Sequence, residues 1–364
     1  MLKKVLLTLS LTVLVVVVSV VGFVSWFSGL MNIPAQQVDV TGTHWQQLPY
    51  LADATPPQRG KILAVVTSTG EMGASGKRTG YELTELARAY YVFIANGFEV
   101  DIASPLGGKP PVVIDVDDMG AYDFAFLNDS AAQTKASATI PVQDINPQDY
   151  EAVYFVGGKG AMFDFPENKA IQTLIKNRYQ ANKVVGAVCH GPAALVNVML
   201  DSGEALLANK QVSGFTNEEE LFLIPTAREI FPFLLEDGLA SQGARVETGP
   251  IYLAQVSHDG NLITGQNPWS VWKVAETMIT QLGHTPRARP TTMEERSVAI
   301  LLTYEESGYQ RAKAQVSMLS QMQGSSFRYM LIAMHAVVAV MHWDLMKAFD
   351  LVSLVVIADS EANP

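Results

Sequence analysis

Short apolar runs alternate with segments of helical periodicity from Lys61 to about Gly283, and this alternation constrains the fold more than any other feature. Lys61–Thr67 (KILAVVT) is apolar almost throughout, as expected for a strand buried on both faces. A helix is predicted over Tyr81–Asn96, and Gly97 is a suitable residue to end it. Strands that alternate with helices indicate an α/β fold with a mostly parallel, doubly wound sheet and helices on both faces.

The same pattern continues along the chain. Strands are predicted at Phe98–Ser104, Tyr150–Val156, Lys183–Val188, Gln211–Phe215, Tyr252–Ser257 and Asn261–Gly265, and helices at Asn168–Ala181, Ala193–Leu200 and Pro268–Leu282. Residues 105–148 are interpreted as a long polar insertion. Active sites of such sheets lie beyond the carboxyl ends of the strands, so the informative residues should follow the strands.

The N-terminal segment Val5–Phe27 contains no charged residue and is long enough, as a helix, to cross a bilayer. Two lysines precede it, and the next Lys or Arg is Arg59. By the positive-inside tendency, residues 1–30 are predicted to be a membrane anchor with a cytoplasmic N-terminus. This predicts a single-pass protein of a bacterial inner membrane, attached to the membrane by this helix, with its catalytic domain in the periplasm. A cleaved signal peptide is the alternative.

The remaining segments flank a central domain predicted at residues 61–285. Residues 31–60, which contain several Pro, Gly and Gln, are interpreted as a linker. Residues 290–364 are predicted to be a helical extension of unknown role, packed on the main domain or on a second copy, so that a homodimer is possible. A membrane contact or a second span are alternatives for its apolar part. His335 and His342 are interpreted as packing residues, because a metal site needs a third ligand.

Charge and cysteine content exclude several classes of partner. The formal net charge of −11 argues against nucleic acid as a partner, because phosphate binding needs clustered Lys and Arg. A single cysteine excludes an intramolecular disulfide and a multi-cysteine zinc site. Cys189 is therefore either a buried apolar residue or a reactive thiol.

Cys189 lies where a predicted strand meets a predicted helix, in the segment GAVCHGPAAL at residues 186–195. A buried strand that ends in one sharply turned residue, followed at once by a helix, is a nucleophile elbow, which exposes that side chain above the sheet. The N-terminus of the helix would favour a thiolate, and Pro192 suits its first turn. We therefore interpret Cys189 as a reactive thiol with His190 beside it.

Further segments accompany this elbow: TGYELTELARAYYVFIANGFEVDIASPLGG (79–108), FVGGKGAMFDFP (155–166), VCHGPA (188–193), GFTNEEE (214–220) and LITGQNP (262–268). Together they resemble the ThiJ/PfpI superfamily, the type 1 glutamine amidotransferase-like group of flavodoxin-like sandwiches. The insertion after the second strand is similar to the branch of glutathione-independent glyoxalases (glyoxalase III), which overlaps with stress-response chaperones. The resemblance covers about residues 60–285.

The resemblance implies roles for individual residues. Cys189 matches the nucleophile and His190 the adjoining catalytic histidine. Glu85 matches the acid that hydrogen-bonds the cysteine sulfur, and burial would keep it protonated. Glu220 matches the acid that orients the histidine, with Glu219 as the alternative.

Two further positions concern the oxyanion formed by nucleophilic attack. The N–H groups of Gly158 and His190 would form an oxyanion hole. Lys159 stands where many relatives have histidine, which leaves a substrate contact or proton-relay step at that position open.

The reaction that the resemblance implies is the conversion of a reactive dicarbonyl such as methylglyoxal into D-lactate without glutathione. The Cys189 thiolate would form a hemithioacetal, and His190 would move a proton between adjacent carbons. This internal redox isomerisation needs no nicotinamide, flavin or metal, and none is predicted. Asp115–Asp118 lacks the pattern of a calcium loop, and Gly157–Gly160 lacks the ending of a phosphate loop.

Other functions use the same chain differently. The cysteine could serve amide hydrolysis, glutamine amidotransfer or proteolysis. It could also act as a redox sensor in a protein that holds unfolded clients. A non-catalytic, membrane-tethered interaction protein is the alternative from a different class.

Overall fold

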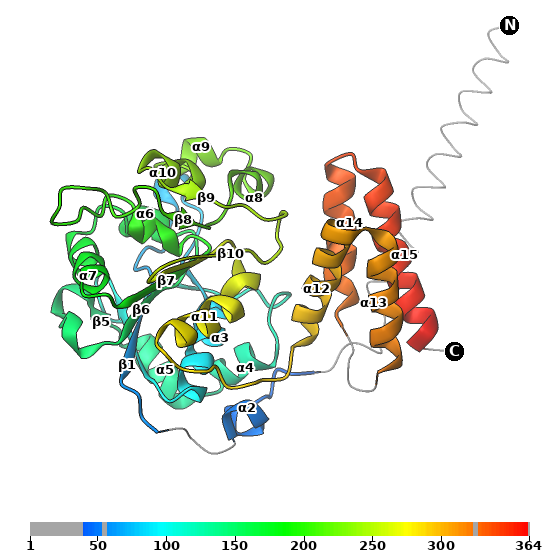
Figure 1. Cartoon of the computed structure of the whole chain (residues 1–364), viewed down its shortest axis with the longest axis horizontal. Coiled ribbons are helices and arrows are strands. Elements are labelled where there is room, and N and C mark those ends of the chain that lie inside the picture. Colours follow the sequence, from blue (N-terminus) through cyan, green and yellow to red (C-terminus); the bar gives the residue numbers. More distant parts are fainter. Residues whose placement is uncertain (1–38, 53–56, 323–326, 363–364) are drawn as a thin grey trace, which may run out of the picture. The chain divides into compact units, whose positions relative to one another are not determined.

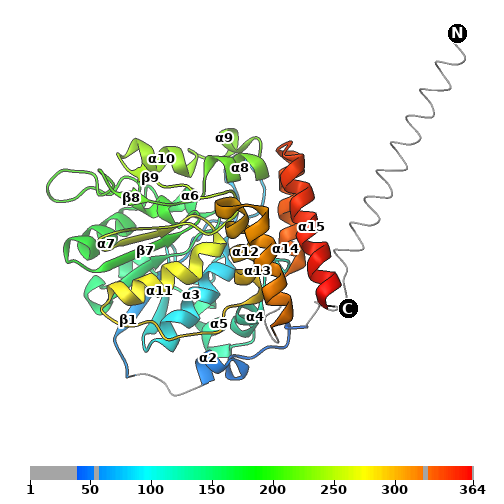
Figure 2. The same cartoon turned by 45° about the vertical axis from the view of Figure 1, so that its right-hand side comes forward.

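The computed structural model describes residues 39–52, 57–322 and 327–362 (Figures 1 and 2). These residues belong to two compact units, of which one is Val40–Pro290 and the other includes Thr291–Pro364. The first unit contains the α/β sheet, and the second consists of helices. The predicted linker and domain limits stay predictions.

A seven-stranded sheet forms the centre of the first unit. Its strands stand in the spatial order β10 (Val256–Asp259), β11 (Leu262–Gly265), β7 (Val184–Val188), β6 (Ala152–Phe155), β1 (Lys61–Val65), β3 (Glu99–Ser104) and β5 (Ile140–Pro141). Only the pair β10–β11 is antiparallel within this sheet. The mostly parallel sheet agrees with the alternation of apolar runs and helices in the sequence.

Helices cover both faces of the sheet because its connections run in two directions. The chain passes from β1 to β3 through α3 (Leu83–Ala95), and from β6 to β7 in the opposite direction through α7 (Lys169–Gln180). Right-handed crossovers in opposite directions place the two helices on opposite faces. Helix α11 (Val271–Gln281) packs against α3 (Figure 2). The order of connections reverses between β1 and β6, which is where sheets of this kind form their sites.

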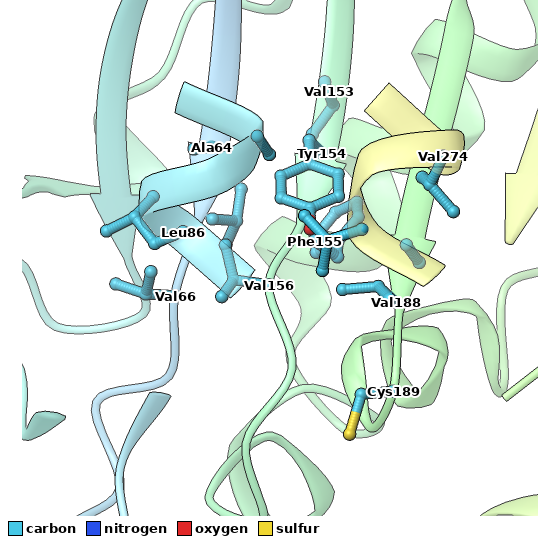
Figure 3. Packing of buried hydrophobic residues seen from close by; sticks show 14 of the residues in the cluster. Ala64, Val66, Leu86, Val153, Tyr154, Phe155, Val156, Val188, Cys189 and Val274 are labelled. Atoms are coloured by element: carbon cyan, nitrogen blue, oxygen red, sulfur yellow. The ribbon is translucent and has the colours of Figure 1, made fainter. Parts of the chain in front are cut away.

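The core lies between the sheet and these helices. Strands β6 and β7 are buried along their whole length, as strands covered on both faces must be. Figure 3 shows Val153, Tyr154 and Phe155 of β6 among the packed side chains, with Leu86 and Val274 contributed by the covering helices. Burial of these side chains fixes where β6 and β7 end, and thus where the residues after them lie.

The predicted polar insertion after β3 is folded rather than irregular. It contains β4 (Val112–Val113), α4 (Ala121–Leu127) and α5 (Ser130–Ser137), and it ends in the edge strand β5. Strand β4 pairs with β2 (Tyr81–Glu82), which precedes α3 directly. The insertion therefore helps to hold the segment that leads into α3.

The prediction of a helix over Ala193–Leu200 is wrong. The chain after β7 forms only the 3-10 helix η6 (Gly191–Leu195), and Val196 then adopts an extended conformation.

A second small sheet pairs β8 (Gln211–Val212) with β9 (Arg245–Val246). The other helices of this unit are α2 (Pro49–Ala52), α6 (Ala161–Asp164), α8 (Asn217–Leu223), α9 (Ala227–Ile230) and α10 (Leu235–Ser241).

The helical unit is formed by α12 (Met293–Ser307), α13 (Tyr309–Gln321), α14 (Tyr329–Met341) and α15 (Leu345–Ala362). Helix α15 packs against α13 and α14, and α12 packs against the same two helices. Polar contacts add to this packing, because the Tyr304 hydroxyl donates to Asp350 Oδ2 over 2.9 Å. The hydroxyl groups of Tyr309 and Ser353 share a hydrogen bond of 2.8 Å.

The membrane-related predictions require correction. Among residues 39–52, 57–322 and 327–362, every helix is too short or too polar to cross a bilayer. Helix α14 has 13 residues, about 20 Å of helix, and α15 carries Lys347, Asp350 and Asp359. The anchor predicted at Val5–Phe27 lies outside the described residues. The fold class is therefore corrected to an α/β sandwich with a helical unit, and the predictions of a membrane helix, membrane attachment and a single-pass inner-membrane location are withdrawn.

Candidate active site

Cys189 occupies a strained turn at the carboxyl end of β7. Its φ is +57°, a left-handed conformation that costs a residue with a Cβ atom about 1–2 kcal/mol. Two hydrogen bonds hold this backbone: Cys189 N–H donates to Gly265 O, and Phe215 N–H donates to Cys189 O, each over 2.9 Å. Figure 3 shows the sulfur directed away from the packed side chains of the sheet.

The turn depends on a glycine that follows it. A Cβ atom at Gly191 would lie 2.3 Å from the carbonyl oxygen of Phe155, so β6 passes too close for any side chain there. This close approach places the segment after β7 directly against the end of β6. Strain at a single non-glycine residue, enforced by its surroundings, is typical of functional sites.

His190 connects the thiol to a carboxylate. Its Nδ1 atom lies 3.3 Å from Cys189 Sγ, and its Nε2 atom lies 2.5 Å from Glu220 Oε2. The imidazole is 1 % exposed and stacks near the rings of Phe215 and Phe231. These two aromatic contacts, which the sequence analysis did not identify, fix the plane of the ring.

Glu219, the alternative to Glu220, makes a different set of contacts. It forms a capping box with Thr216 at the start of α8. Its Oε1 atom accepts hydrogen bonds from Tyr252 N–H, Gln266 Nε2 and Asn267 Nδ2. The structure thus brings Glu220, and not Glu219, to His190.

Glu85 lies in the first turn of α3 and is fully buried. Its Oε2 atom accepts a hydrogen bond of 2.7 Å from Gly157 N–H, and an interaction with the Cys189 side chain tends to lower the pKa of its carboxyl group. Gly157 is enclosed by the same groups, since a Cβ atom there would lie 2.5 Å from Glu85 Oε2 and 2.8 Å from Cys189 Cβ. The Tyr154 hydroxyl donates to the backbone oxygen of Glu85 and holds this turn from below.

Burial determines which of these groups carry charge. It raises the pKa of Glu85 well above the ordinary value, which favours the protonated form of this carboxyl. A protonated Glu85 can donate to the sulfur. Burial also tends to raise the pKa of Glu220, but the charge and hydrogen bond of His190 outweigh this and lower it. Glu220 is therefore a carboxylate that accepts from the imidazole.

The thiol itself is not activated in the way that the sequence predicted. Burial, followed by the charges of Glu85 and Glu82, raises the pKa of Cys189 well above its ordinary value, and Lys159 lowers it. The helix predicted over Ala193–Leu200 is replaced by the five-residue η6. A thiolate at this position must therefore rely on neighbouring side chains.

The predicted oxyanion hole has two free donors. Within the described part of the chain, neither Gly158 N–H nor His190 N–H donates a hydrogen bond to a protein acceptor. Gly158 has a φ of +104°, and a Cβ atom there would lie 2.3 Å from Gly80 O. The role of both N–H groups stays a prediction. No cluster of His, Cys, Asp and Glu suitable for a metal ion occurs among the residues that the structure describes.

The fold and site define a class: an α/β sandwich with a cysteine elbow, an adjoining histidine and a buried acid from the first crossover helix. Residues 77–281 match the model of the DJ-1/PfpI family, and the chain belongs to this family. Among its relatives, glyoxalase 3 of Candida albicans is 30% identical over 232 residues, which are 60% of this chain and 97% of that protein. The glutathione-independent glyoxalase HSP31 of Saccharomyces cerevisiae is 31% identical over 240 residues, 61% and 98% of the two chains.

Solved structures give the same assignment. The Rapid Encystment Protein 24 kDa of Francisella tularensis matches with a TM-score of 0.59 and 36% identity, over 62% of this chain and 99% of that one. The crystal structure of glyoxalase III from Candida albicans matches with a TM-score of 0.56 and 28% identity, over 61% and 97%. The predicted membership of this superfamily is confirmed.

Proposed function

We propose that this protein converts methylglyoxal, or a related reactive dicarbonyl, into D-lactate or the corresponding 2-hydroxy acid without glutathione, with Cys189 as the nucleophile. It is an enzyme of the glyoxalase III type, the class to which its curated relatives belong. The observation that carries the proposal is the placement of Cys189 Sγ 3.3 Å from His190 Nδ1, at a strained turn where the carboxyl group of Glu85 and the cysteine side chain both lie against Gly157.

The first step is attack of the thiolate on the aldehyde carbon. A carbon–sulfur bond forms, and the π electrons of the carbonyl group move to oxygen. The N–H groups of Gly158 and His190, which have no other acceptor among the described residues, would stabilise this oxyanion. Protonation of the oxygen gives a hemithioacetal.

The second step transfers a proton between adjacent carbons. His190 takes the proton from the former aldehyde carbon and returns it to the neighbouring carbon, while Glu220 stabilises the imidazolium through its contact with Nε2. The former aldehyde carbon reaches the oxidation level of a thioester, and the ketone becomes an alcohol. Water then cleaves the carbon–sulfur bond, releases the 2-hydroxy acid and restores the thiol.

The test uses the purified full-length protein with methylglyoxal and no glutathione, followed by an enzymatic assay for D-lactate. We expect D-lactate from the wild type and none from Cys189→Ala at equal helix content by circular dichroism. Wild-type protein that forms no D-lactate would overturn the proposal. Release of ammonia from glutamine would favour a hydrolase instead. Protection of an unfolded client by Cys189→Ala would favour a holding role.

A further inference from the structure

Two charged residues beside the thiol, Glu82 and Lys159, have no role in the steps above. Both are half-buried, whereas the thiol, the imidazole and the two carboxyl groups assigned to the reaction are buried. They are therefore the charged groups at the solvent side of the site. The sequence assigned no role to Glu82, although it lies only three residues before Glu85, and it left a substrate contact or proton-relay step at Lys159 open.

The backbone fixes where these two side chains begin. Glu82 N–H donates to Gly157 O over 3.2 Å. A Cβ atom at Gly158 would lie 2.9 Å from Glu82 N, and one at Gly157 would lie 2.8 Å from Cys189 Cβ. The two glycines are thus enclosed between β2 and the elbow, and Lys159 follows them directly. This arrangement holds the backbone of Lys159 and Glu82 close to each other and to the cysteine.

Lys159 interacts electrostatically with three groups of the site. Its charge lowers the pKa of Glu82, of Cys189 and of Glu220. Glu82 acts on the cysteine with the opposite sign. Glu82 and Lys159 thus act on the thiol with opposite charges. The structure records no ion pair of Lys159 among the described residues, so its charge remains available to the site.

We propose that Lys159 is a positioning residue that stabilises the thiolate of Cys189 and the oxyanion formed on the substrate, and that Glu82 opposes it when ionised. This inference rests on the proposed function, since it concerns how the same nucleophile is activated. Lys159 thereby takes the role that the sequence predicted for the N-terminus of the helix after the elbow.

Every titratable group that faces the thiol enters the expected pH dependence. These groups are Glu82 from β2, Glu85 from α3, Tyr154 from β6, Lys159 after β6, and His190 with its partner Glu220 from α8. Burial raises the pKa of Glu82 to about 7, with a lowering effect of Lys159 and raising effects of Asp115 and Asp118. The carboxyl of Glu82 is thus mostly neutral below pH 6 and mostly ionised above pH 8.

The experiment measures alkylation of Cys189 by iodoacetamide from pH 5 to pH 10 in the full-length protein without substrate. Cys189 is the only cysteine, so the rate reports one thiol. Lys159→Gln should slow alkylation at pH 7.5 about tenfold, the effect of one pKa unit. Lys159→Arg, which keeps the charge, should stay within about threefold of the wild type. Glu82→Gln should accelerate alkylation about threefold at pH 8 and leave it unchanged at pH 5.5, where Glu82 is already neutral.

Control variants separate charge at the site from charge on the surface. Lys169→Gln and Glu204→Gln remove exposed charges and should leave the profile unchanged. Lys159→Met keeps the length of the side chain and replaces Lys159→Gln if the latter does not fold. The role of Lys159 would be overturned if Lys159→Gln had the pH profile of alkylation of the wild type. It would also be overturned if Lys159→Arg slowed alkylation as much as Lys159→Gln. Slower alkylation in Glu82→Gln at pH 8 would overturn that of Glu82.

The same variants separate this inference from the proposed reaction. D-lactate formation together with an unchanged profile in Lys159→Gln would overturn the role of Lys159 and leave the reaction standing. A shifted profile in a protein that forms no D-lactate would overturn the reaction and leave the electrostatic role standing.

Discussion

His190 Nε2 lies 2.5 Å from Glu220 Oε2, although the two residues are 30 positions apart in the chain. The preceding glutamate, Glu219, points to the amides of Gln266 and Asn267 instead. Consecutive residues of a helix project about 100° apart, so only one of two adjacent glutamates on α8 can face the imidazole. The structure therefore distinguishes the roles of Glu220 and Glu219, which the sequence alone leaves equivalent.

Glu220→Gln should lower kcat about 100-fold or more, because the amide cannot stabilise the imidazolium as the carboxylate does. The measurement is kcat for D-lactate formation from methylglyoxal. The matched control is Glu219→Gln, which should mainly lower the free energy of unfolding, by about 1–3 kcal/mol, because several buried donors lose a charged acceptor. A larger loss of kcat in the control would contradict the assignment.

Replacement of the cysteine should affect activity and stability separately. Cys189→Ala and Cys189→Gly should both be inactive, because neither has a nucleophile. Cys189→Gly should be the more stable of the two by about 1 kcal/mol, because glycine adopts the φ of +57° without steric cost. Urea unfolding measures the difference, and a more stable Cys189→Ala would mean that the turn is not strained.

Gly157→Ala should damage the site and the fold together. Its methyl group would overlap the Glu85 carboxylate and the Cys189 side chain, at 2.5 and 2.8 Å. We expect a loss of about 1–3 kcal/mol in the free energy of unfolding and a large loss of D-lactate formation. Gly42→Ala serves as the control, because no heavy atom lies within 4 Å of its added Cβ. Equal effects of the two variants would argue against this packing.

The helical unit should lose stability in acid through His335. Burial, with a smaller effect of Lys347, lowers the pKa of this imidazole to about 4. An unfolded histidine titrates near pH 6.5, so the unfolded chain binds the proton first as the pH falls. The stabilisation is therefore complete above pH 6.5 and is lost as the pH falls towards 4.

The expected loss between pH 8 and pH 5 is about 2 kcal/mol in the free energy of unfolding. Urea titrations followed by circular dichroism measure it in the full-length protein. His335→Leu, which has no titratable group, should show a smaller loss over the same range. An identical pH dependence in the two proteins would refute the buried neutral imidazole.

Much of the sheet could be predicted because its strands are buried on both faces. Val184–Val188 must be apolar at every position, and such a run is visible in the sequence without knowledge of the neighbours. The insertion after β3 was harder to interpret, since α4 and α5 are short and are stabilised by packing against the rest of the unit. The helix predicted after Cys189 was also wrong, because the 3-10 helix η6 ends after five residues and Val196 is extended.

The sequence by itself determined the alternation of strands and helices, the family, and the position of the only cysteine at a strand end, because these depend on local periodicity and on contiguous motifs. Tertiary structure decided which glutamate meets His190, that Glu85 is buried next to the elbow, and that the backbone of Glu82 and Lys159 lies close to the cysteine. Those relationships depend on burial and on distances between segments far apart in the chain, and both exist only once the sheet has brought its carboxyl ends together.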